Sequence, residues 1–259
     1  MTQTLWPTCG YSLLAHNDTG HLVVTDDFLR FLASAHEPFF GFVFYDSPHS
    51  FALPPGDPGP FRPSWESVDH LALGPGFDPK PFFNRYRNSL HAVDALAGEL
   101  LRALEARGLL ERTIVVATGD HGEEFDDLGL NYWGHNGNFA RYQTQVPLLV
   151  HWPGREPGDY DHLTSHADLA PTLLAGAFGC RAQASAHSNG RDLFDESPRR
   201  YVVSSNDRAI AILEPERITL VERYGAATVL DPELRELDVE PDGALLREVA
   251  ASMGAFYAP

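Results

Sequence analysis

The sequence is poor in cysteine and in long apolar runs, and each shortage excludes a class of protein. Its 259 residues include only 2 cysteines, and neither Cys9 nor Cys180 belongs to a C-x-x-C pair, which excludes zinc-ribbon and thioredoxin motifs. No run approaches the ~20 apolar residues that cross a bilayer, since the longest, residues 38–45, has strand length. The first residues lack the basic and apolar regions of a signal peptide. These features predict a soluble chain.

Positive charge is also scarce. There are 19 lysines and arginines against 36 aspartates and glutamates, so the formal net charge is -17. This charge repels nucleic acid and anionic lipid head groups, and no nucleic-acid partner is expected. An anionic substrate is still compatible, because a bound divalent cation can dominate the local field. The 12 histidines are therefore the residues to inspect, since histidine is the commonest metal ligand and acid-base group.

The apolar pattern alternates between strand-like and helix-like segments, which predicts an α/β fold. Strands are expected at 39–45, 113–118 and 146–151. Helices are expected at 26–34 behind a Thr25 cap, at about 83–107, and from a capping box at 165–168 to about 178. The proline- and glycine-rich segment 47–81 is expected to be a loop.

Changes in the apolar pattern along the sequence divide the chain into three parts. Residues 1–24 show no periodicity and are expected to be irregular. Residues 25–195 carry the α/β pattern. Residues 196–259 contain short β-rich runs and a final helix at about 243–253, which predicts an antiparallel meander closed by a helix.

One candidate site directly follows the strand at 113–118. Residues 119–124 read GDHGEE, so Asp120 and His121 stand where ligands collect in α/β sheets, at the carboxyl end of a strand. A carboxylate and an imidazole there can face one metal ion, and the flanking glycines leave room for it. The alternative is that Asp120 caps a turn and His121 is a solvated loop residue. The position after a buried strand favours the metal interpretation.

Two further clusters follow in the same pattern. Asp46 and His49 come directly after the apolar run 39–45 and could project into the same cleft. The alternative is a proline turn in which Asp46 accepts backbone N–H groups, and it is favoured for Asp46 but not for His49. His135 lies fourteen residues after His121 in the aromatic and glycine-rich segment 131–138. A loop returning there would let His135 donate to a phosphate or sulfate oxygen; the alternative is an exposed histidine in a packed turn.

The segment that leads into the strand at 146–151 is polar. Arg141, Gln143 and Gln145 could help to order the cleft, but their pattern indicates no catalytic role.

Several motifs together resemble the sulfatase-like branch of the alkaline-phosphatase superfamily. They are TGDHGEE at 118–124, WGH at 133–135 and SHADLAPT at 165–172. FYDSPH at 44–49, GLNYWGH at 129–135 and RYQTQVP at 141–147 are similar to the YejM/PbgA group of bacterial inner-membrane proteins, which carry a periplasmic sulfatase-like domain. The resemblance extends from about Thr25 to the end, and the motifs are specific in combination.

The resemblance implies a fold, a site and a setting. The fold would be a three-layer α/β/α sandwich of the alkaline-phosphatase type, present in part, with a small carboxyl-terminal β-rich subdomain. Asp120 and His121 would bind a divalent metal ion (Mg, Mn, Zn or Ca), while His49 and His135 would line the pocket for the phosphate or sulfate group of an ester, which in some cases is a lipid. The setting would be the periplasmic face of a bacterial inner membrane, where the family is anchored.

The sequence also departs from the family pattern. The family takes its nucleophile and a further metal carboxylate from an earlier strand and helix, yet the C-x-P-x-R signature is absent here, since Gly10 follows Cys9. A catalytic site needs an activated nucleophile beside the metal, so we expect a partial enzyme that is inactive alone. The alternatives are a non-catalytic envelope domain involved in lipid or lipopolysaccharide homeostasis, and an α/β domain without retained function.

Overall fold

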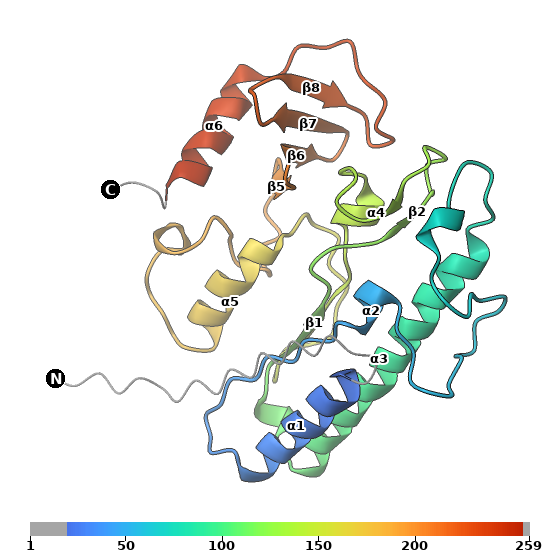
Figure 1. Cartoon of the computed structure of the whole chain (residues 1–259). Coiled ribbons are helices and arrows are strands. Elements are labelled where there is room, and N and C mark those ends of the chain that lie inside the picture. The colour runs from blue at the N-terminus through green and yellow to red at the C-terminus, as the bar shows by residue number, and fades with distance from the viewer. Residues whose placement is uncertain (1–19, 256–259) are drawn as a thin grey trace. The chain divides into compact units, whose positions relative to one another are not determined.

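The computed structural model describes residues 20–255, which form two compact units (Figure 1). The first unit comprises the described residues up to Val116 together with Val150–Arg155. The second comprises Ala117–Leu149 and the described residues from Glu156 onward. Among the described residues, no helix combines the length and the apolar character that a membrane span requires.

Two helices build the core of the first unit. Helix α1, Gly20–Ser34, packs along α3, Lys80–Ala106 (Figure 1). The buried side chains of Leu32, Leu104 and Leu109 meet between them. The helical spacing of apolar residues predicted α3, and Gly108, at φ +63°, ends it as a left-handed residue usually does.

The amino-terminal predictions need correction. Residues 1–19 of the segment expected to be irregular lie outside the described residues, and residues 20–24 are helical. Thr25 does not cap a helix that starts at Asp26. It lies inside α1, 1% exposed, and its hydroxyl is 3.0 Å from the hydroxyl of Tyr45. Because α1 already begins at Gly20, Thr25 lies in the helix interior and cannot be its cap.

The strand predicted at 39–45 is absent. The described part of the chain forms no strand in this segment, and Phe40 and Phe42 are 58% and 53% exposed. A strand exists only when a neighbour pairs with it, and no other described segment does so here. The apolar run was therefore misinterpreted as a central strand.

The long loop predicted at 47–81 is confirmed for most of its length, but it contains two helical turns, α2 at Ser47–Ser50 and η1 at His70–Ala72, and its last two residues already belong to α3. The side chain of Asn88 on α3 holds the loop, because its amide exchanges two hydrogen bonds with the backbone of Phe61. The loop is thus fixed to the helix by polar contacts.

Two of the predicted strands are present in shorter form. Strand β1 covers Val115–Thr118 after the turn η2, Leu110–Arg112, and it pairs with β4, Leu148–His151, in a two-stranded sheet. β1 therefore ends one residue before the GDHGEE motif, as predicted.

A small hairpin and several short helices follow in the second unit. Strands β2, Glu124–Phe125, and β3, Trp133–Gly134, are antiparallel, with Glu124 opposite Gly134. The remaining short elements are α4 at Arg141–Thr144, η3 at His166–Asp168, α5 at Leu169–Gly176 and η4 at Ala184–Ala186. The predicted capping box is confirmed between Ser165 and Asp168.

The carboxyl-terminal meander is also confirmed, with one strand more than predicted. The antiparallel strands are β5 (Val202–Ser205), β6 (Ala209–Glu214), β7 (Arg217–Glu222) and β8 (Ala227–Leu230), in that order (Figure 1). Helix α6, Gly243–Gly254, packs through Leu245 and Val249 on Ile212, while the preceding residue, Ala211, contacts Phe139 in a separate cluster. Successive residues of a strand point to opposite faces, which explains the two clusters. The domain boundary at 195/196 stays a prediction.

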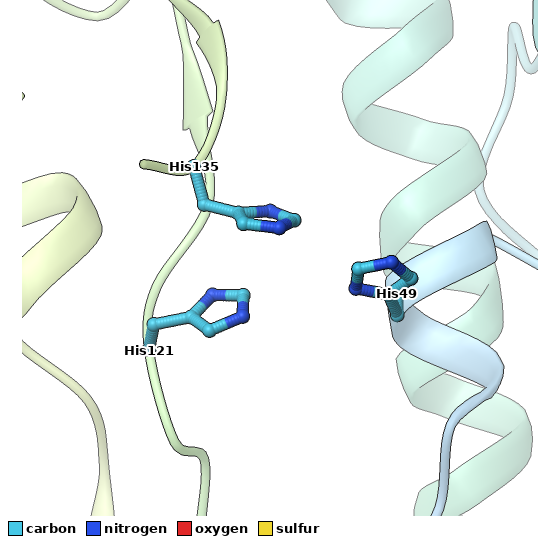
Figure 2. Close-up of side chains that lie close together, drawn as sticks. All are labelled: His49, His121 and His135. Atoms are coloured by element: carbon cyan, nitrogen blue, oxygen red, sulfur yellow. The ribbon is translucent and has the colours of Figure 1, made fainter. Parts of the chain in front are cut away.

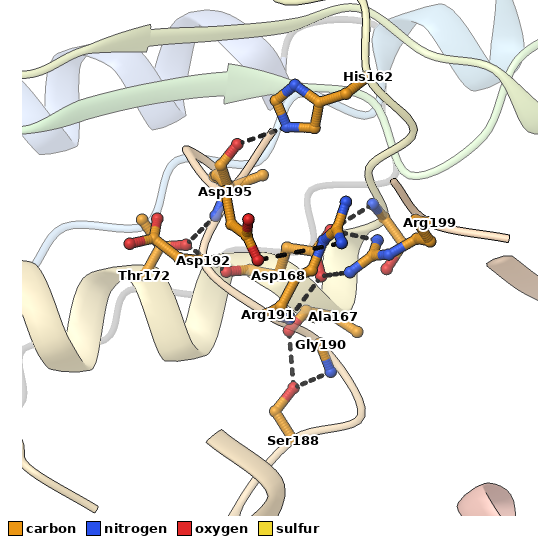
Figure 3. A network of polar contacts seen from close by, with 12 residues as sticks. His162, Ala167, Asp168, Thr172, Ser188, Gly190, Arg191, Asp192, Asp195 and Arg199 are labelled. Carbon is orange, nitrogen blue, oxygen red and sulfur yellow. Dashed lines mark hydrogen bonds and ion pairs between the residues drawn. The ribbon is translucent and has the colours of Figure 1, made fainter. Parts of the chain in front are cut away.

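A buried carboxylate anchors the segment between α5 and the meander. Asp168 is 1% exposed and accepts two hydrogen bonds from the Arg199 guanidinium, at 2.7 and 2.6 Å (Figure 3). The backbone amides of Ser165 and Arg191 donate to the same carboxylate. Burial raises the pKa of Asp168, but these hydrogen bonds and the nearby positive charge outweigh it and leave the pKa below its ordinary value.

Candidate metal and anion site

The backbone around the GDHGEE motif is held by contacts on both sides. Thr118, the last residue of β1, donates its hydroxyl to the carbonyl oxygen of Pro147 at 2.9 Å. The ring Nε2 of His166 lies 2.8 Å from the carbonyl oxygen of Gly119. Because a carbonyl only accepts, His166 is the donor. These two bonds fix the chain on which Asp120 and His121 stand.

The His121 ring has the tautomer that a metal ligand needs. Its Nδ1 lies 2.9 Å from the carbonyl oxygen of Gly122, so Nδ1 carries the proton and donates it. In the neutral ring the lone pair is then on Nε2, which lies 3.7 Å from the Oδ2 atom of Asp120. A backbone carbonyl that orients the other ring nitrogen is the usual outer partner of a metal-binding histidine.

The separation of these two atoms fits a shared ion. Two atoms that each lie about 2.1 Å from one cation can be no more than about 4.2 Å apart. The 3.7 Å between Asp120 and His121 satisfies this limit. Both side chains are partly or largely exposed, 76% for Asp120 and 36% for His121, so an ion can reach them.

The β2–β3 hairpin brings His135 back to His121. Their rings are stacked, with centroids 4.1 Å apart and planes 30° from parallel (Figure 2). The Nδ1 atom of His135 lies 2.8 Å from the Oε2 atom of Glu123, whose side chain is nearly buried. Because the carboxylate accepts, His135 donates from Nδ1, and its ring orientation is fixed.

The structure therefore gathers part of the predicted site. Asp120, His121 and His135 lie together in the second unit, and the predicted returning loop is what brings His135 there. His49, which Figure 2 also labels, belongs to α2 of the first unit, and its role stays a prediction. The backbone oxygen of Asp46 accepts from the amide of His49, as in the turn considered for it.

Sequence reasoning missed Glu123 as the partner of His135. Consecutive side chains of an extended chain point to opposite sides. Glu123 therefore contacts His135, while Glu124 accepts a hydrogen bond from the side-chain amide of Gln143. The available signal was the pair of acids, of which Glu124 is the first residue of the hairpin.

Solved structures with a similar backbone define the class of fold. A putative sulfatase from Bacteroides thetaiotaomicron superposes with a TM-score of 0.65 at 18% identity, covering 99% of this chain and 66% of that one. The phosphonate monoester hydrolase of Agrobacterium radiobacter gives 0.64 at 18% identity, covering 92% and 60%. The chain thus has an α/β fold of the sulfatase and alkaline-phosphatase type, as predicted.

The chain belongs to the Sulfatase family, because the model of that family matches residues 16–179. Among its relatives is the inner membrane protein YejM of Salmonella typhimurium, which is 28% identical over 75% of this chain. The match covers 33% of YejM, so the chain spans about a third of the length of this relative.

Proposed function

We propose that this chain supplies the metal- and anion-binding part of a hydrolase or transferase acting on phosphate or sulfate esters. The observation that carries the proposal is the Asp120–His121 pair, whose ligand atoms lie 3.7 Å apart with the His121 tautomer fixed by Gly122. Membership of the Sulfatase family supports the ester chemistry. One neighbour of the fold is named a phosphonate monoester hydrolase and another a putative sulfatase, so we propose both phosphate and sulfate esters as substrates.

The residues of the site take separate roles. Asp120 and His121 would hold a divalent ion (Mg, Mn, Zn or Ca), which when bound would act as a Lewis acid toward the ester oxygens and toward the attacking nucleophile. His135, held through Nδ1 by Glu123, can in its imidazolium form donate from Nε2 to a non-bridging ester oxygen. We assign the same anion-binding role to His49, on the basis of the FYDSPH motif and the family resemblance.

Turnover requires a nucleophile that these 259 residues do not provide in the family's C-x-P-x-R form. Sulfate and phosphate transfer proceeds through an activated nucleophile beside the metal. We therefore propose that this chain binds the ion and the anionic group, and that hydrolysis needs a nucleophile supplied from outside the segment.

The ion site can be tested on the 259-residue chain by titration with Mn²⁺, followed by NMR. A paramagnetic ion at the site broadens the ring signals of His121 and His135 at lower concentrations than those of histidines outside the site. The double variant Asp120→Ala with His121→Ala should lose this preferential broadening at His135.

The matched control is Asp161→Ala with His162→Ala, which removes the same pair of residue types elsewhere in the unit. The Nε2 of His162 donates to the carbonyl oxygen of Leu193, a purely structural contact. This control should leave the broadening of His121 and His135 unchanged. Equal broadening of His135 in wild type and in the Asp120/His121 double variant would contradict the proposal.

A second function is favoured by one specific observation, the similarity to an inner membrane protein. Together with the missing C-x-P-x-R motif, it supports a non-catalytic envelope domain at the periplasmic face that contributes to lipid homeostasis. Replacing Asp120 and His121 in the organism distinguishes the two functions. The cellular role is lost if it depends on the ion site, and it is kept if the chain acts as a non-catalytic domain that does not need the ion.

A further inference from the structure

One buried glutamine connects the two chain segments that carry the candidate site. Gln143 lies in α4 and is 5% exposed. Its side-chain Oε1 accepts from the backbone amides of Gly137 and Asn138, at 3.1 and 3.4 Å. Its Nε2 donates to the Oε2 atom of Glu124 at 2.6 Å. One side chain thus bonds to both sides of the β2–β3 hairpin.

The backbone of the same residue makes a third connection. The carbonyl oxygen of Gln143 accepts from the amide of Gly122, which directly follows His121, at 2.8 Å. The approach is close, since a Cβ at Gly122 would lie 2.1 Å from the carbonyl oxygen of Tyr142. The segment that carries His121 and the segment that carries His135 are therefore both hydrogen-bonded to Gln143 of α4.

The carboxylate that receives the glutamine is itself unusual. Glu124 is 0% exposed, and its Oε2 atom accepts from the amides of both Gln143 and Asn138. Its Oε1 atom is buried and has no hydrogen-bond partner among the described residues. Burying a carboxylate with one oxygen unbonded lowers the stability of the fold, so its presence here calls for a specific explanation.

We propose that Gln143 is a positioning residue, which sets the spacing between His121 and His135 through its bonds to Gly122, Gly137 and Glu124. This inference rests on the proposed function, because it assigns to Gln143 control over the affinity of the Asp120–His121 site for a divalent ion. Outer partners that orient metal-binding side chains typically change metal affinity by about 10- to 100-fold when they are replaced.

The test is the Mn²⁺ affinity of the 259-residue chain, measured by the same NMR broadening, in the variant Gln143→Glu. This change places a second carboxylate against Glu124 at the 2.6 Å contact, so the two segments separate. We expect an affinity about 10-fold weaker or more. Gln145→Glu makes the same chemical change two residues away at an exposed position and should leave the affinity within about twofold.

The exchange variant Gln143→Glu with Glu124→Gln restores one amide and one carboxylate, and we expect it to recover most of the lost affinity. Urea unfolding of each protein separates positioning from folding. If Gln143→Glu does not fold, Gln143→Asn, too short to reach both partners, takes its place with the same expected loss.

Two results would overturn the inference. One is a folded Gln143 variant with the Mn²⁺ affinity of the wild type. The other is an exchange variant that folds as well as the wild type yet binds Mn²⁺ no better than Gln143→Glu. If Asp120→Ala with His121→Ala also binds Mn²⁺ like the wild type, the proposed function fails; if only the Gln143 variants do so, the positioning role alone fails.

Discussion

Replacement of Arg199 by alanine tests the account of how the second unit is held together. The change removes both hydrogen bonds from the guanidinium to Asp168 and leaves a carboxylate that is 1% exposed with only two backbone donors. Removing one partner of a buried ion pair costs about 3–5 kcal/mol, and the surviving amide bonds favour the lower end of this range. We expect the free energy of unfolding to fall by about 3 kcal/mol at pH 7.

The assay is urea unfolding of the 259-residue chain, followed by circular dichroism. Arg235→Ala is the matched control, since Arg235 pairs with Asp231 at 3.4 Å but its side chain is 73% exposed, compared with 13% for Arg199. An exposed pair contributes about 1 kcal/mol or less. If both variants lost the same small amount, the Asp168–Arg199 pair would not be the anchor described above.

Two further predictions concern the same unit. Gly122→Ala should destabilise the chain by about 1–3 kcal/mol in thermal unfolding, because the new Cβ meets the backbone carbonyl oxygen of Tyr142. Gly74→Ala is the control and should change the stability little, because no atom lies within 4 Å of a Cβ placed there. The pKa of Asp168 is lowered from 3.8 in the folded protein, so its contribution to stability is present above pH 3.8 and is lost as the pH falls through the folded pKa. The stability advantage of wild type over Asp168→Asn should therefore shrink on acidification below pH 3.8, and an advantage that stayed constant there would refute this reasoning.

The elements that sequence predicted correctly are those whose signal is local. Helix α3 is amphipathic over its whole length, the capping box at Ser165 carries both of its partners within four residues, and the meander alternates within short strands. In each case the residues that form the element also carry the pattern. Tertiary contacts only had to agree with it.

The errors arose where a distant partner decides the outcome. The run 39–45 has strand composition, but pairing depends on a neighbour that composition does not reveal. Thr25 has the chemistry of a helix cap, yet it bonds to Tyr45, twenty residues away. Propensity is a weak guide when such contacts compete with it.

The candidate site divides in the same way. Asp120 and His121 could be found from sequence because a strand end is a predictable place for ligands. Glu123 and Glu124 could not be assigned their roles, since the partners, His135 and Gln143, come from segments 12 and 19 residues away. Those pairings exist only once the β2–β3 hairpin has formed.

The most direct measurement of the central claim is a crystal structure of the chain grown with Mn²⁺ and examined by anomalous scattering. We expect a peak within about 2.4 Å of both the His121 Nε2 atom and an Asp120 carboxylate oxygen. A structure with ordered Asp120 and His121 side chains that diverge, and with no peak between them at saturating Mn²⁺, would contradict it.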